Sequence, residues 1–152
     1  MRRPRRRKAH DPMSGRPLPS IEIPMRVAFS DLDPMHVVWH GNYLKYFDAA
    51  RFALFDSAGV DLYRYSIEKR IAFPVTRQST KHIVALRHND AFVCKATVTE
   101  AQYKIAMDFT IRRADDHELC ARGSSEQVAV QVPEMELLFA VPDDIRMALG
   151  FI

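Results

Sequence analysis

Apolar residues recur every three or four positions after Asn42, which is the pattern of a helix with one buried face. Asn42 is a favoured residue at a helix N-cap, and Gly59 is of a type that commonly ends a helix. The segment from Leu44 to Ala58 is therefore predicted to be the longest helix in the chain. The apolar positions of this pattern are Tyr43, Tyr46, Phe47, Ala50, Leu54 and Ala58.

Most of the remaining chain alternates apolar and polar residues with a period of two, as β-strands do when one face is buried. Turn residues at 88–90 and 114–117 separate these runs, so consecutive strands are expected to pair antiparallel. One helix with such a sheet is an α+β layout in which the sheet wraps the helix. The expected elements are strands at 21–29, 72–85, 91–100, 104–113 and 118–132, an edge strand at 135–140, a short irregular or helical connection at 61–70 and a short helix from 142 to about 150.

Charge divides the 152-residue chain near residue 20. Residues 1–20 hold seven Lys or Arg and one acid, whereas residues 21–152 hold the other 15 basic residues and 18 acids. We therefore expect a basic, disordered tail at 1–20 and one domain at 21–152. The tail could contact the phosphates of nucleic acid or an anionic membrane. A solvated extension is the simpler interpretation, and translation could instead begin at Met13 or Met25.

Composition argues against several classes of protein. A hydrophobic fraction of 47% with nine Phe and five Tyr is typical of a folded domain. No apolar run approaches the roughly 20 residues of a membrane span, and the first residues lack the apolar core of a signal peptide. Cys94 and Cys120 show no CxxC spacing and are expected to be reduced packing thiols. We therefore expect a cytoplasmic protein.

Candidate chemistry gathers at residues 29–43, between the first strand and the helix. This stretch contains the carboxylates of Asp31 and Asp33, two histidines and a tryptophan. A carboxylate beside a helix N-terminus faces unpaired N–H groups and the positive end of the helix dipole, which together can polarise a carbonyl. If the strand continued through Asp33, both carboxylates would share one face and one could titrate near neutrality. Alternatively, Asp33 opens a turn with the following proline and Asp31 caps one, which we favour for Asp31.

A longer motif carries a family resemblance. The run Asp-Leu-Asp-Pro-Met-His-Val-Val-Trp-His-Gly-Asn-Tyr at 31–43, followed by Tyr-Phe-Asp-Ala-Ala-Arg at 46–51, resembles the signature of hot-dog-fold acyl-CoA thioesterases of the 4-hydroxybenzoyl-CoA thioesterase type. Runs at 73–75, 86–90 and 121–130 are similar as well. The resemblance implies an α+β hot-dog fold, in which an antiparallel sheet wraps one long central helix. It also implies hydrolysis of an acyl-CoA thioester to the free acid and CoA.

The resemblance assigns roles by motif position. Asp33 matches the catalytic carboxylate, acting as nucleophile or as base on water, and the backbone N–H of His40 matches the carbonyl-polarising amide. The His40 side chain matches a histidine of the family's short-chain-acyl branch. Trp39 and Tyr43 would line the acyl or pantetheine path. His36 stands where many members have glycine, and it could narrow or polarise the pocket.

Lys104 matches a basic family position and is expected to contact a phosphate of coenzyme A. Phe29 stands where the short-chain branch often has tyrosine. No cofactor is expected, because coenzyme A is part of the substrate. The resemblance implies an acyl-CoA or acyl-carrier-protein thioester as substrate and a homodimer or homotetramer whose sheets join edge to edge. Nucleic acid is not expected as a partner.

Other functions stay open on the sequence. Asp33, His36 and His40 could bind a metal if both histidines shared a helix face, but the residues between them make a poor helix interior, so no metal is expected. The chain has no GxSxG elbow, which argues against a serine hydrolase. A carrier-protein thioesterase, a dehydratase of the same fold or a non-catalytic acyl or nucleic-acid binding module would also fit. Asp48 either pairs with Arg51 on the helix flank or is a reserve catalytic carboxylate.

Overall fold

The computed structural model describes residue 10 and residues 15–152, so the expected basic tail lies largely outside the described residues. The structure combines helices with antiparallel strands, as the alternating patterns predicted. The helices are the 3-10 turn η1 (Phe29–Asp31), α1 (Asn42–Ser57), α2 (Leu62–Glu68) and α3 (Asp143–Ala148). The strands are β1 (Ser20–Arg26), β2 (Ile71–Ala72), β3 (Val75–His82), β4 (Ala91–Ala101), β5 (Ile105–Arg113), β6 (Leu119–Gln127), β7 (Val130–Gln131) and β8 (Glu136–Leu137).

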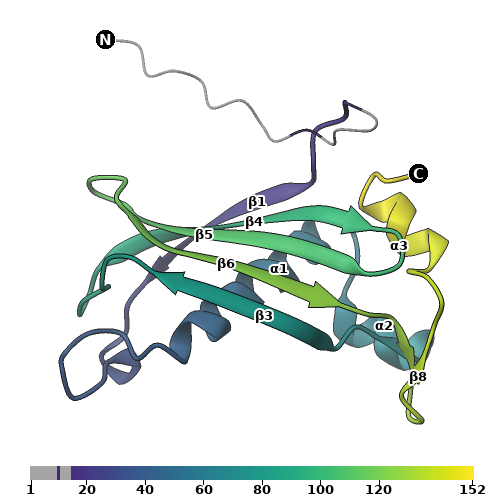
Figure 1. Ribbon diagram of the computed structural model, residues 1–152, viewed down its shortest axis with the longest axis horizontal. Helices are drawn as coiled ribbons and strands as arrows, with labels where there is room; N and C mark the ends of the chain where they lie inside the picture. The colour runs from purple at the N-terminus through teal and green to yellow at the C-terminus, as the bar shows by residue number, and fades with distance from the viewer. Residues whose placement is uncertain (1–9, 11–14) are drawn as a thin grey trace.

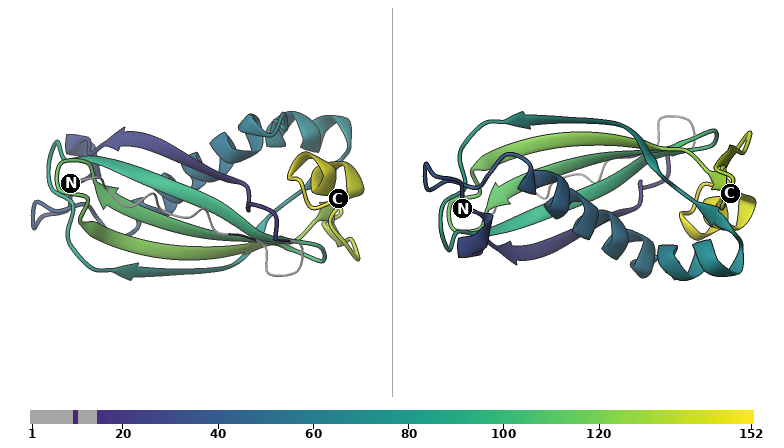
Figure 2. Two further views of the ribbon diagram at one scale, coloured as in Figure 1. Left: turned by 90° about the horizontal axis from the view of Figure 1, so that it is seen from above. Right: turned by 90° about the horizontal axis from the view of Figure 1, so that it is seen from below.

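Five strands form one antiparallel sheet in the order β1, β4, β5, β6, β3, so β1 and β3 are its edges. A small second sheet joins β2, β7 and β8. Helix α1 crosses one face of the large sheet, whose strands curve along it (Figures 1 and 2). The short helices α2 and α3 lie together beyond the C-terminal end of α1 (Figure 1).

The core lies between α1 and the large sheet. Every second residue of β4 and β5 points to the helix and is buried, while the buried residues of α1 follow the helical spacing of three and four. Burying each large side chain of this kind contributes roughly 1.5–3 kcal/mol. These side chains include Tyr46, Phe47, Leu54 and Phe55 from α1, Phe92 and Val98 from β4, and Ile105, Met107 and Ile111 from β5.

Gly123 in β6 lies directly against the Phe47 ring of helix α1. The Phe47 ring stacks on Phe109, with 4.7 Å between the ring centroids. A Cβ at position 123 would lie 2.5 Å from an atom of the Phe47 ring. Glycine at this position therefore sets how closely the helix packs on the sheet.

The central helix differs in part from the prediction. It has 16 residues, so the expectation of one long central helix is not confirmed. The short helices α2 and α3 lie where a helical connection and a short C-terminal helix were expected. Asn42, the predicted N-cap, is the first helical residue, and Gly41 occupies the cap. The Asn42 side chain instead donates to the Asp31 carbonyl, 2.8 Å away. Gly59 lies just past the helix in the left-handed region, with φ of 81°.

Three predicted strands are shorter than expected. The first ends at Arg26 because residues 29–31 form η1, so the interpretation that places Asp31 and Asp33 on one strand face is wrong. The expected strand at 72–85 divides into β2 and β3 around Phe73 and Pro74, and proline cannot donate to a ladder. The expected strand at 118–132 divides into β6 and β7 around Val128 and Ala129, where the chain passes from the large sheet to the small one.

Cys94 and Cys120 are buried free thiols on β4 and β6. Burial raises the pKa of Cys94 to about 12, so this thiol stays protonated at neutral pH. None of the helices in the described part of the chain is long and apolar enough to cross a membrane.

Candidate active site

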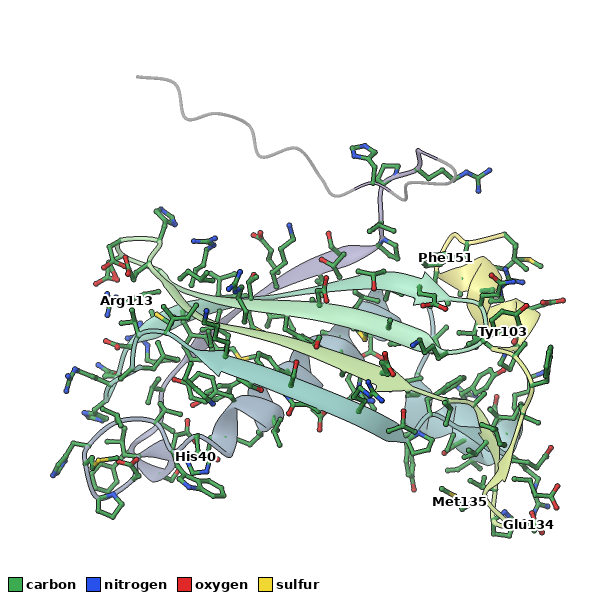
Figure 3. The ribbon with its side chains drawn as sticks, viewed as in Figure 1. His40, Tyr103, Arg113, Glu134, Met135 and Phe151 are labelled. Atoms are coloured by element: carbon green, nitrogen blue, oxygen red, sulfur yellow. The ribbon has the colours of Figure 1, made fainter. Side chains whose placement is uncertain are left out.

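Most of the candidate side chains of the motif lie on one loop, residues 32–41, which we call the motif loop. It connects η1 to the N-terminus of α1 at one end of the sheet, where His40 is labelled in Figure 3. Two isolated β-bridges shape it, one between Leu32 and Val38 and one between Val37 and Arg87. The Val38 amide also donates to the Leu86 carbonyl at 2.9 Å. The loop is therefore closed on itself and tied to the strand β3–β4 connection.

Asp33 opens a tight turn within this loop. Its backbone N–H donates to the Val37 carbonyl at 2.8 Å, and its own carbonyl accepts from the His36 amide at 3.0 Å. Its Oδ1 accepts from the amides of Met35 at 2.8 Å and Val37 at 3.5 Å. Among the described residues its Oδ2 has no hydrogen-bond partner. The predicted turn is confirmed, and it leaves one carboxylate oxygen free.

Asp31 is buried and has a different environment from Asp33. Its Oδ2 accepts from the Tyr46 hydroxyl at 2.8 Å and the Ala28 amide at 3.0 Å, and its Oδ1 accepts from Lys45 Nζ at 2.9 Å. Burial alone would raise the pKa of Asp31, but the hydrogen bonds from Lys45, Ala28 and Tyr46 together outweigh burial and lower it. Asp31 is thus a charged structural group, and the predicted capping role is confirmed by its bond to Ala28.

The main chain of Asp31 also anchors the start of α1. Its carbonyl accepts from the Trp39 amide at 2.9 Å and from the Asn42 side chain at 2.8 Å. The sequence reasoning did not include Lys45 and Tyr46 in the site. The hydroxyl of Tyr46, which lies on the buried stripe of α1, was the available signal, because a buried tyrosine hydroxyl usually has a partner.

The N-terminus of α1 presents unpaired amides. In residues 15–152 the backbone N–H groups of His40 and Gly41 have no hydrogen-bond acceptor. The Trp39 ring packs over Gly41, where a Cβ would lie 2.3 Å from a ring atom. The Trp39 and His40 rings are 5.2 Å apart, and Trp39 is 50% exposed. Glycine at position 41 therefore lets an aromatic ring cover the helix start.

The other predicted residues are distributed more widely. His36 is exposed on the turn with φ of 63°, a left-handed conformation that glycine adopts without steric cost. Tyr43 is 3% exposed and packs against Tyr46 and His82, so in this chain it is part of the core. Lys104 follows Tyr103 on the turn between β4 and β5, and Figure 3 shows Tyr103 at the end of the sheet opposite His40. A nine-residue strand such as β5 spans roughly 27 Å, so one chain does not bring Lys104 to the motif loop.

A pocket of about 180 Å³ lies between the first two turns of α1 and the sheet, on the side of edge strand β3. Its walls are largely apolar, and Asp48 is its one charged residue. Asp48 also pairs with Arg51 at 3.4 Å, which confirms the predicted pairing on the helix flank. The lining residues are Leu44, Phe47 and Asp48 from α1 and Val75, Gln78, Phe109 and Ser125 from the sheet.

The geometry does not favour the metal alternative. His36 and His40 lie on the motif loop and not on a helix, so they do not share a helix face. In the described part of the chain, no group of three or more His, Cys, Asp or Glu side chains could hold a metal ion.

Comparison with known proteins places this arrangement among thioesterases. A profile of the Thioesterase-like superfamily matches residues 27–149. The 4-hydroxybenzoyl-CoA thioesterase of Pseudomonas sp. strain CBS-3 is 24% identical over 130 residues, which is 84% of this chain and 88% of that protein.

Solved structures agree on the fold. The crystal structure of that Pseudomonas enzyme has a TM-score of 0.77 at 23% identity, covering 85% of this chain and 98% of that one. A 1,4-dihydroxy-2-naphthoyl-CoA thioesterase from Synechocystis has a TM-score of 0.76 at 20% identity, covering 86% of this chain and 95% of that one. The expected hot-dog arrangement of an antiparallel sheet against a helix is confirmed.

Proposed function

Because the chain belongs to the Thioesterase-like superfamily, we propose that it hydrolyses an acyl-CoA thioester to a free acid and coenzyme A. One observation carries the proposal. The motif loop holds a carboxylate with a free oxygen, Asp33 Oδ2, on the same ten residues as the unpaired amides of His40 and Gly41. A thioester carbonyl needs an electrophilic cradle and a nucleophile or base, and these groups supply both.

In the proposed reaction the His40 amide polarises the thioester carbonyl. His40 immediately precedes the Gly41 N-cap of α1, where the helix dipole adds positive potential that favours the developing oxyanion. Asp33 Oδ2 then either takes a proton from water, whose oxygen attacks the carbonyl carbon, or attacks that carbon itself. In both routes the C–S bond breaks and coenzyme A leaves as a thiolate that takes up a proton. The second route forms an acyl-aspartyl anhydride, which water hydrolyses.

The turn of Asp33 supports this role physically. The Met35 and Val37 amides hold Oδ1, so the carboxylate is oriented before substrate binds. Orientation of a reacting group in advance lowers the entropic cost of reaching the transition state. The Asp31 network, in turn, fixes the backbone on both sides of the loop.

The pocket beside α1 suggests the size of the acyl group. Its volume of about 180 Å³ is below the roughly 300–1,000 Å³ of sites for drug-sized ligands, so we propose a short or single-ring acyl group. The related enzymes from Pseudomonas and Synechocystis are named for aromatic acyl groups. Asp48 would then face the acyl group, either toward a polar substituent or as a reserve carboxylate. The path that leads the acyl group into this pocket would be lined by Trp39 and His36, with Tyr43 packed beneath it.

We also propose that two or more copies assemble. Edge strand β3 carries unpaired backbone groups, and the acyl pocket lies beside it. Lys104, which we assign to a coenzyme A phosphate, is too far from the motif loop to serve it within one chain. The buried free thiols Cys94 and Cys120 fit a reducing compartment, so we propose a cytoplasmic location.

The test is thiol release from a panel of short, long and aromatic acyl-CoAs. We expect Asp33→Asn to lose about a hundredfold or more in kcat, as removal of an acid–base group does. Asparagine retains an oxygen that can accept from the Met35 amide, so the turn is preserved. Asp56→Asn, an exposed carboxylate near the end of α1, is the matched control and should be fully active.

Each outcome of this panel separates the alternatives. Release from the wild type that Asp33→Asn retains would exclude Asp33 as the working group. No release from any acyl-CoA would exclude a coenzyme A thioesterase, and acyl-carrier-protein thioesters would be tested next. A thermal melt of each variant shows whether a loss of activity reflects unfolding.

A further inference from the structure

Two aromatic side chains are exposed side by side at the end of the sheet opposite the motif loop. Tyr103, on the turn between β4 and β5, is 53% exposed, and Phe139, after β8, is 87% exposed. Their ring centroids are 5.6 Å apart and the rings are nearly perpendicular, at 77°. We call this pair the aromatic platform. So much exposed aromatic surface is unfavourable in water, which suggests a ligand that covers it.

Backbone contacts hold the platform in place. The Val141 amide donates to the Gln102 carbonyl at 2.8 Å, which ties the segment carrying Phe139 to the turn carrying Tyr103. Arg146 Nε donates to the Ala101 carbonyl at 3.0 Å and ties α3 to the same turn. The two segments that carry the rings are therefore held side by side before any ligand binds, which lowers the cost of binding.

Lys104, the residue after Tyr103, brings positive charge to the turn that carries the platform. Lys104 Nζ lies 2.9 Å from Glu126 Oε1, and Arg77 Nε lies 3.9 Å from Glu126 Oε2. Two cations thus share one carboxylate, and this trio carries a net charge of +1. A lysine ammonium has three donors, so Lys104 keeps two for another acceptor. The Arg77 side chain is 81% exposed and free to turn toward a ligand.

We propose that the aromatic platform stacks the adenine of coenzyme A while Lys104 and Arg77 contact its phosphates. This inference rests on the proposed thioesterase function. Exposed rings that stack a base beside cations that pair with phosphates are the usual chemistry of nucleotide binding. A protein partner would instead require a large interface with an apolar core, and a pair of exposed rings next to a lysine in the chain is smaller and more polar than that.

The platform must serve a motif loop from another copy. The two sites lie at opposite ends of the sheet, roughly 27 Å apart along β5. An antiparallel pairing of two β3 edges would place the platform end of one sheet beside the motif-loop end of the other. Each complete site would then combine the loop of one copy with the platform of the second.

The experiment compares two substrates with the same acyl group, an acyl-CoA and the nucleotide-free acyl-N-acetylcysteamine thioester. Stacking on an aromatic side chain is worth about 1–3 kcal/mol per base, so Tyr103→Ala and Phe139→Ala should each raise KM for acyl-CoA by about 5- to 150-fold. We expect kcat with acyl-CoA, and kcat/KM with the small thioester, to stay unchanged. Tyr103→Phe, which keeps a ring, should restore a KM near that of the wild type.

Several results would overturn the proposal. Equal losses on both thioesters would show that the platform is structural, and an unchanged KM for acyl-CoA would show that it does not touch the substrate. Tyr63→Ala is the matched control, because Tyr63 is 73% exposed and lies on α2, away from the platform.

A binding measurement separates this inference from the proposed function. Calorimetric titration with adenosine 3′,5′-bisphosphate needs no turnover, so it applies even if the wild type releases no thiol. We expect binding that Tyr103→Ala weakens about 5-fold or more and Tyr63→Ala does not. No binding to the wild type, or equal binding to Tyr103→Ala and the wild type, would exclude a nucleotide site here.

Discussion

Replacing Asp31 with alanine tests whether the buried carboxylate holds the motif loop together. The change leaves the Tyr46 hydroxyl and the Ala28 amide without the acceptor that each has at 2.8 and 3.0 Å. Tyr46 is 5% exposed, so water cannot readily replace the carboxylate. A buried donor left without a partner costs about 1–3 kcal/mol, so the orphaned Tyr46 hydroxyl should lower the free energy of unfolding by about that amount. Ala28 is exposed, so its amide can be hydrated. The Lys45 side chain is 63% exposed and should simply become hydrated.

The assay is urea unfolding followed by far-UV circular dichroism, for Asp31→Ala, Tyr46→Phe and the double variant. Tyr46→Phe alone should cost about 1 kcal/mol, because Asp31 keeps two other donors. In the double variant no tyrosine hydroxyl is left unpaired, so its loss should be about 1–3 kcal/mol smaller than the sum of the single losses. A loss below about 1 kcal/mol in Asp31→Ala, or strict additivity in the double variant, would refute this account.

The same network predicts a pH dependence. The pKa of Asp31 is lowered in the folded protein, so its contribution is fully present above the unfolded value of about 4. It is lost as the pH falls from there through the lower folded pKa. The difference in stability between the wild type and Asp31→Ala should therefore be constant from about pH 5 to 7 and shrink below about pH 4. A difference that grows on acidification would contradict the assignment.

Three further substitutions test close approaches and strain. Gly123→Ala should cost about 1–3 kcal/mol because its Cβ would lie 2.5 Å from the Phe47 ring, and Phe47→Leu in the same background should recover part of the loss in a thermal melt. His36→Gly should raise the free energy of unfolding by up to about 1 kcal/mol, since φ is 63° there, whereas a drop would argue against strain. Gly41→Ala should displace the ring of Trp39, which is the one tryptophan of the chain, and thereby shift the fluorescence spectrum. The free energy of unfolding should change by less than about 1 kcal/mol. An unchanged spectrum would contradict the close packing of the ring on Gly41.

The sequence predicted the elements whose burial follows a simple period. Helix α1 was identified from its apolar stripe, and β4 and β5 from strict alternation, because in each case the core contacts one regular face. The strand at 72–85 was predicted too long because a tertiary change of sheet occurs at Phe73 and Pro74. Local alternation gives no information about which sheet a segment joins.

The sequence predicted some parts of the candidate site and not others. The family motif gave the residues of the loop, and a proline after Asp33 gave its turn. The η1 turn was missed because side chains 14 and 15 residues further along the chain stabilise it, from Lys45 and Tyr46 to Asp31. Contacts of that separation leave no periodic trace in a sequence. The position of Lys104 was equally hidden, since it depends on the direction in which β5 crosses the sheet.

The two aspartates of the motif have different roles: Asp31 is structural, and Asp33 is the proposed catalytic carboxylate. Both are carboxylates two residues apart, yet η1 turns Asp31 inward, where three donors occupy its oxygens, and leaves Asp33 half-buried with Oδ2 unbonded. A carboxylate held by three donors is a poor base, because protonating it would break those bonds. Had the strand continued, the two carboxylates would have shared one face of the sheet. The bend at Phe29–Asp31 therefore separates the two carboxylates and leaves Asp33 Oδ2 without a bond to Asp31's donors, so this oxygen is available for the proposed attack on a thioester.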